Sequence, residues 1–190
     1  MRRCLIALVV SCAALTAGVA SADPEVGVTR ERDVFRVHAA ALVAVDVKTA
    51  WQVLTDYNRL AEFVPGMRLS RVLSNAGEPL RVEQDGDVGV LFFNRAFRII
   101  LEIEERPFER LAFHGAGGDI KHMEGEWRLR AEGPSVRVEY DVQLEPDFWV
   151  PPLLGTALMR HDIKKNFEGV IKEMQKRYVI SSGKIVAAPR

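Results

Sequence analysis

The spacing of hydrophobic and polar residues changes twice along the chain and predicts a strand, a helical segment, a run of strands and a final helix. Over residues 33–44 apolar and polar positions alternate, as in a half-buried strand. At Asp46, a residue type that caps helices well, the apolar interval becomes three and four residues. This predicts a helix over 47–57 and a second short helix that ends at Pro65-Gly66.

From Met67 to Glu145 period-two segments follow one another, separated by short turn signals that include Asp85-Gly86-Asp87 and the glycine-rich run 115–118. Short connections require antiparallel pairing. With the first strand, the chain is predicted to hold about seven strands, the further six being 68–74, 80–84, 88–104, 110–114, 120–130 and 136–144.

The last periodic segment is an amphipathic helix predicted over 154–178, the longest element of the chain. Its apolar stripe includes Ile163 and Phe167, and its opposite side carries lysines. The tail 181–190 has no period and is expected to be frayed. The order of elements predicts an α+β fold, with the long helix against a curled antiparallel sheet. If the helix does not fill the concave face, a lined space remains between them.

The N-terminus differs from the rest of the chain. A basic start is followed by the apolar run 5–15 and the small residues Ala20-Ser21-Ala22, the order of a secretory signal peptide. We expect cleavage after Ala22, which makes 1–22 the signal and 23–32 a polar tether. Two alternatives are a lipoprotein site at Cys12 and a twin-arginine signal, and the surrounding residues favour neither.

Composition and charge then narrow the function. The chain is 48% hydrophobic and 27% charged, as in globular proteins, and 26 basic side chains balance 26 acidic ones. The charge therefore gives no reason to expect nucleic acid as a partner. Cys4 and Cys12 would leave with the signal, so a periplasmic or secreted mature protein would have no disulfide and no thiolate site.

Three motifs carry a family resemblance: WQVLTDYNRLAEFVP at 51–65, GEWRL at 125–129, and Tyr140 with the proline-aromatic corner before the last helix. Over 33–178 the chain resembles the START-like (SRPBCC) polyketide cyclase and coenzyme Q-binding family. The resemblance implies a helix-grip domain over 33–180, with two short helices after the first strand. It also implies a cavity for an apolar molecule such as a lipid, quinone, sterol or polyketide.

The positions expected to face this cavity are mostly apolar, with two polar groups among them. Arg95 alone breaks the apolar face of its strand, and it either offers a cationic fork to a ligand or extends into solvent. Tyr140 would offer a hydroxyl donor. The predicted ligand-binding residues are Phe93, Arg95, Phe97, Ile99, Leu101, Trp127, Tyr140, Ile163 and Phe167.

Two further groups of residues could form a metal site or a catalytic dyad, but each also has a simpler structural explanation. His122, Glu124 and Glu126 alternate on one strand face, where they could bind a metal, but ion pairs with neighbouring arginines on a solvated face explain them as well. His161 lies beside Asp162, but adjacent helical residues point about 100° apart and do not form a dyad.

The leading hypothesis is an exported carrier of an apolar ligand, without catalytic residues, cofactor or metal. Brief contact with a membrane would allow ligand exchange. One alternative is an enzyme of the cyclase or dehydratase type that uses Tyr140, Arg95 or His161. The other is a protein-interaction module in which helix and sheet pack without a cavity.

Overall fold

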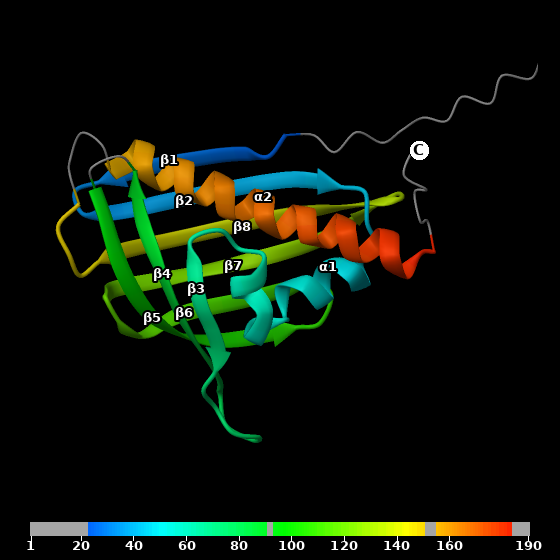
Figure 1. Ribbon diagram of the computed structural model, residues 1–190, viewed down its shortest axis with the longest axis horizontal. Coiled ribbons are helices and arrows are strands. Elements are labelled where there is room, and N and C mark those ends of the chain that lie inside the picture. The colour runs from blue at the N-terminus through cyan, green and yellow to red at the C-terminus, as the bar shows by residue number, and fades with distance from the viewer. Residues whose placement is uncertain (1–22, 91–92, 151–154, 184–190) are drawn as a thin grey trace, which may run out of the picture.

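One long helix lies across the concave face of a curved antiparallel sheet in the computed structural model (Figure 1). The structure describes residues 23–90, 93–150 and 155–183. Its elements are β1 (Glu25–Glu31), β2 (Val34–Val43), α1 (Val47–Leu54), the 3-10 helix η1 (Tyr57–Glu62), β3 (Met67–Val72), β4 (Leu80–Val90), β5 (Phe93–Arg106), β6 (Arg110–Gly118), β7 (Ile120–Glu132), β8 (Ser135–Pro146) and α2 (Gly155–Ser181). This confirms the predicted α+β helix-grip class.

The sheet follows the order β1-β2-β8-β7-β6-β5-β4-β3, with antiparallel pairing throughout. Strands β3 to β8 form a meander in which each strand pairs with its neighbour in the chain. The hairpin of β1 and β2 joins the meander at β8, with Phe35 opposite Leu144 and Val43 opposite Val136. Helices α1 and η1 fill the connection between β2 and β3.

The predicted tether 23–32 is wrong for most of its length, because residues Glu25–Glu31 form β1 and the sheet has eight strands instead of about seven. Glu25 pairs with Ala40 and Glu31 with Val34, and Val28 is buried. Pro24 and Gly27 resembled breakers in the sequence. The strand forms here because the edge of β2 supplies hydrogen-bond partners along the whole segment.

The predicted turn at Asp85-Gly86-Asp87 is also wrong, since these residues continue β4. A Cβ on Gly86 would lie 2.6 Å from the Gly66 carbonyl oxygen and 2.9 Å from Cζ of Phe97. Close approach of two neighbours requires the glycine. The predicted strand 88–104 is therefore divided between β4 and β5, and residues 91–92 lie outside the description.

The glycine-rich run 115–118 belongs to β6, where a turn was predicted, and the chain reverses only at Gly118. Gly118 has a φ of 95°, which favours glycine, and a Cβ there would lie 2.1 Å from the Arg98 carbonyl oxygen. The earlier glycines allow the strand to run on, with Gly115 opposite Leu101.

Helix α1 begins as predicted, because the Asp46 carboxylate accepts a hydrogen bond of 2.6 Å from the Thr49 backbone N–H. It ends at Leu54, earlier than predicted. The Thr55 hydroxyl donates to the Trp51 carbonyl at 2.9 Å, and the chain then tightens into η1 from Tyr57.

Helix α2 corresponds closely to the predicted helix 154–178. It buries Phe167, Val170, Ile171 and Met174 against the sheet and α1. None of the described helices is long and apolar enough to cross a bilayer. The expected signal peptide 1–22 and most of the expected tail lie outside the described residues.

Candidate ligand-binding site

A cavity of about 520 Å³ lies between the concave face of the sheet, the two N-terminal helices and α2. One wall is β5, where Phe97, Ile99, Leu101 and Ile103 alternate along the strand and face inward. The six residue steps from Phe97 to Ile103 span ~20 Å of extended chain. The cavity is therefore elongated along the strands.

The floor of the cavity is aromatic. The Trp127 and Phe167 rings are nearly parallel, with centroids 5.7 Å apart, and connect the sheet to α2. Tyr140 packs against Trp127 at a centroid distance of 4.4 Å and against Phe113 at 6.1 Å. Such contacts fix the orientation of the rings and give the floor a defined shape.

The Tyr140 hydroxyl is a polar group in this apolar floor. Its ring borders the cavity, and burial raises the pKa of the phenol. No side chain or backbone group within the described ranges accepts a hydrogen bond from it. A ligand carbonyl, hydroxyl or carboxylate in the cavity could supply the missing partner.

A second tyrosine in the lining, Tyr57, already has its partner. Its hydroxyl donates to Glu105 Oε1 at 2.5 Å, and burial followed by this hydrogen bond raises the pKa of the phenol. The sequence indicated Tyr57 only as part of the helical stripe. Nothing in the local pattern shows that Glu105, forty-eight residues away, reaches it.

The mouth of the cavity is more polar than its interior. Gln84 and Asp87 come from β4, and Asp162, Lys165 and Asn166 come from the N-terminal half of α2. Strand β4 and helix α2 thus bring polar groups to the region where a ligand would enter, while the deeper positions stay apolar.

Close contact between α2 and the loop after η1 bounds this mouth. A Cβ on Gly169 would lie 2.4 Å from the Phe63 carbonyl oxygen and 2.6 Å from Cδ of Pro65. Glycine within a helix costs about 1 kcal/mol relative to alanine, so its position here has a packing reason. The sequence analysis did not identify it, because the contact joins distant segments.

The C-terminal half of α2 is held in place by ion pairs. Arg177 bonds to Asp56 at 2.8 Å and to Glu173 at 2.8 Å, and its guanidinium lies over the Phe63 ring. Burial raises the pKa of Glu173, but hydrogen bonds from Arg177 and Lys176 more than offset this and leave the pKa below its usual value. The ion pair with Asp56 and the contact with the Phe63 ring therefore hold this half of the helix against η1.

Seven of the nine predicted binding residues line the cavity: Phe97, Ile99, Leu101, Trp127, Tyr140, Ile163 and Phe167. Arg95 does not. Its side chain is exposed, with Cζ 4.4 Å from the centroid of Phe148, so it follows the solvent alternative. The side chain of Phe93 lies outside the description. His161 is exposed and is not part of the lining.

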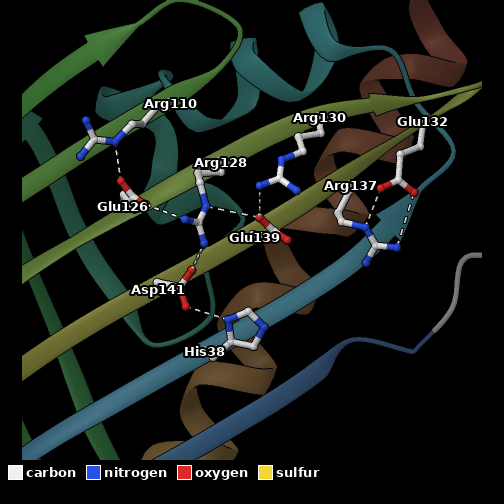
Figure 2. A network of polar contacts seen from close by, with 9 residues as sticks. All are labelled: His38, Arg110, Glu126, Arg128, Arg130, Glu132, Arg137, Glu139 and Asp141. Carbon is white, nitrogen blue, oxygen red and sulfur yellow. Dashed lines mark hydrogen bonds and ion pairs between the residues drawn. The ribbon is translucent and has the colours of Figure 1, made fainter.

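The outer, convex face of the sheet carries a network of ion pairs (Figure 2). Arg128 is at its centre and pairs with Glu126 at 2.9 Å, Glu139 at 3.3 Å and Asp141 at 2.5 Å. His38 Nδ1 lies 2.7 Å from Asp141.

The ion-pair explanation of the charged face of β7 is therefore confirmed for Glu126 and Arg128, and Arg130 lies 3.8 Å from Glu139. His122 lies 3.6 Å from Glu124. In the part of the chain that the structure describes, no cluster of three or more potential ligands suits a metal ion.

Comparisons with known proteins agree with this geometry. Residues 43–170 match the sequence model of a family described as polyketide cyclase / dehydrase and lipid transport. No curated protein matched significantly.

Many solved structures share the fold, and three of them show the range of the similarity. A START superfamily protein from Mycobacterium smegmatis is 17% identical, with a TM-score of 0.61, over 77% of this chain and 98% of its own. A STAR-related lipid transfer protein from Xanthomonas axonopodis is 12% identical, with a TM-score of 0.60, over 79% and 98%. Zhui aromatase/cyclase from a Streptomyces species is 15% identical, with a TM-score of 0.56, over 76% and 93%.

Proposed function

The chain belongs to the polyketide cyclase / dehydrase and lipid transport family, and from this premise we propose that it carries an apolar small molecule in its cavity. The single observation that supports this most is the elongated cavity of about 520 Å³ with an apolar, aromatic lining. Lipids, quinones, sterols and polyketide-like molecules fit this description. The family description and the name of the Xanthomonas structure include lipid transport or transfer.

Burial of apolar surface supplies the main part of the energy for such binding. A ligand that buries roughly 300 Å² of apolar surface gains about 7 kcal/mol at ~25 cal/mol per Å². Loss of motion and ordering of the ligand offset part of this gain. A Kd of 1 μM needs about 8.2 kcal/mol, so burial of this area alone gives weaker than micromolar binding. A hydrogen bond to the Tyr140 hydroxyl would strengthen it and would select ligands by their polar group.

The carrier is favoured over an enzyme because of what surrounds the cavity. Among the lining residues that the structure describes there is no histidine or cysteine, and the Tyr57 hydroxyl is occupied by Glu105. Tyr140 has a raised pKa, which suits a donor and opposes a base at neutral pH.

A second candidate is an enzyme of the cyclase or dehydratase type. The fold similarity to an aromatase/cyclase and the Tyr140 hydroxyl in an apolar part of the lining favour it. In that case Tyr140 would protonate or hold a ligand oxygen during ring closure. The third alternative, an interaction module without a cavity, is disfavoured by the cavity itself.

We propose further that residues 1–22 direct export and that the mature protein begins at Asp23. The basic, apolar and small residues of this segment support the proposal. Brief contact with a membrane would then load and unload the carrier. N-terminal sequencing of exported protein tests the cleavage site, and an uncleaved chain or a lipid on Cys12 would contradict it.

The decisive experiment is solvent extraction and native mass spectrometry of the purified protein. Tyr140→Phe is compared with Arg95→Met, which alters a polar group outside the cavity lining. A carrier shows a co-purifying apolar ligand, a lower affinity of Tyr140→Phe for ligands with a polar group, and no turnover. Turnover of polyketide-like substrates that only Tyr140→Phe abolishes would establish the enzyme instead.

A further inference from the structure

A second hollow, of about 340 Å³, lies outside the cavity between α2 and the loop after η1. We call it the lysine groove. Pro65 and Lys165 line both the cavity and the lysine groove. The groove therefore begins beside the cavity mouth, and a ligand whose chain lies in the cavity could extend its end past Lys165 into the groove.

The carboxylates in the lysine groove already have cations of their own. Glu168 pairs with Lys164 at 3.9 Å. Glu173 pairs with Lys176 at 3.0 Å and with Arg177 at 2.8 Å. Glu173 is thus paired twice and Glu168 is paired loosely, and these two acids offset only part of the charge of the three lysines of the groove, Lys165, Lys172 and Lys176.

Two positive charges in the groove lack such a partner. Lys165 and Lys172 are exposed, line the groove and form no ion pair with any carboxylate of the described chain. They are seven residues apart, which is two turns of helix, so they lie on the same side of α2 at ~10 Å along its axis. The groove thus has an uncompensated positive edge beside the cavity mouth.

The opposite edge of the groove is apolar. It consists of Phe63 and Pro65, and the absence of a side chain at Gly169 lets this loop approach the helix. An apolar edge facing two free ammonium groups suits the junction between a hydrocarbon chain and an anionic headgroup. A neutral polar headgroup would leave both lysine charges uncompensated.

We propose that the natural ligand is an amphiphile with an anionic headgroup. Its apolar chain lies in the cavity, and its carboxylate or phosphate lies in the lysine groove between Lys165 and Lys172. This inference rests on the proposed function and deepens it. It also reassigns the cationic contact that the sequence had suggested for Arg95.

The test compares laurate with 1-dodecanol, which share a chain and differ in headgroup charge. Each displaces the neutral apolar dye N-phenyl-1-naphthylamine from the full chain at pH 8 and low salt. Two exposed ion contacts make laurate about tenfold tighter. In the Lys165→Met/Lys172→Met variant the ratio of the laurate affinity to the dodecanol affinity falls to about one, and this ratio is the readout because Lys165 also lines the cavity. Lys48→Met, which removes an exposed lysine of α1 outside both hollows, keeps the preference.

The outcomes separate this inference from the function on which it rests. If neither dye nor amphiphile binds, the proposed function is wrong. If laurate and dodecanol bind equally to the wild-type protein, the proposed carrier function is supported and the proposal of an anionic headgroup is wrong. If the double variant still prefers laurate, the headgroup does not lie in the lysine groove and the proposal is wrong. Binding to phosphatidylglycerol vesicles is measured for the same proteins. If the double variant loses only this vesicle binding and keeps the preference for laurate, the proposal is also wrong, because the lysines then contact a membrane and not the headgroup of a bound ligand.

Discussion

Replacing Leu101 with tryptophan should fill part of the cavity, stabilise the empty protein and weaken ligand binding. Leu101 is 5% exposed, lies in the middle of β5 and faces the cavity. Tryptophan adds roughly 60 Å³ of side chain, which is a small part of the available volume. At about 24 cal/mol per Å³ of cavity filled, the free energy of unfolding should rise by ~1.4 kcal/mol.

Leu129→Trp is the matched control. Leu129 is also 5% exposed, on β7, but it does not line the cavity. The same enlargement there overpacks the core and should lower the free energy of unfolding by about 1–3 kcal/mol. The two variants therefore differ in the sign of their effect, although the chemical change and the burial are the same.

Urea denaturation measures the free energy of unfolding, and titration with N-phenyl-1-naphthylamine measures binding. Leu101→Trp should unfold at higher urea and bind the dye at least tenfold more weakly. If it is destabilised as much as Leu129→Trp, the space in the cavity does not exist in solution. If it is stabilised but binds the dye unchanged, the ligand occupies another site.

Phe167→Ala should lower the free energy of unfolding by about 3 kcal/mol, the lower end for a buried phenylalanine, because one side of its ring borders the cavity. The affinity for the dye should also fall, and urea denaturation and dye titration measure the two effects. Gly169→Ala, usually stabilising in a helix, should destabilise by about 1–3 kcal/mol because its Cβ meets the Phe63 carbonyl; a gain in a urea melt would show that the loop moves easily. Because the pKa of Glu173 is lowered, its ion pairs stabilise the fold above pH ~4.5 and are lost as the pH falls further. The stability of Glu173→Gln should therefore depend less on acid pH than that of the wild type, and circular dichroism during acid unfolding measures this.

Periodicity identified most of the wall of the cavity, since the period of an element decides which side chains share a face. On β5 the alternation placed Phe97, Ile99 and Leu101 inward, as observed. It also placed Arg95 on that face. Whether a position lies over the cavity or beyond its end depends on where the neighbouring elements stop. Arg95 lies beyond that end, where its side chain is exposed to solvent and packs on Phe148.

Glycines mark the limit of what the sequence could predict. Gly86 and Gly118 are indistinguishable by local pattern, yet the first continues a strand past a close neighbour and the second ends one. Gly169 and the role of Lys165 at the mouth depend on the loop at Phe63, which is about a hundred residues earlier in the chain. Such contacts are decided by the packed fold and leave no periodic trace.

The junction between β2 and β8 has a consequence for how the chain folds. The strands from β3 to β8 pair with immediate neighbours, so their contacts close short loops and can form quickly. The hairpin of β1 and β2 is made first during synthesis, but its partner edge, with Phe35 opposite Leu144, exists only after more than a hundred further residues have emerged. A lone hairpin is marginally stable in water. We therefore expect its docking to be the late, slow step, and until then the open edge of β8 is where two unfinished chains would join and aggregate.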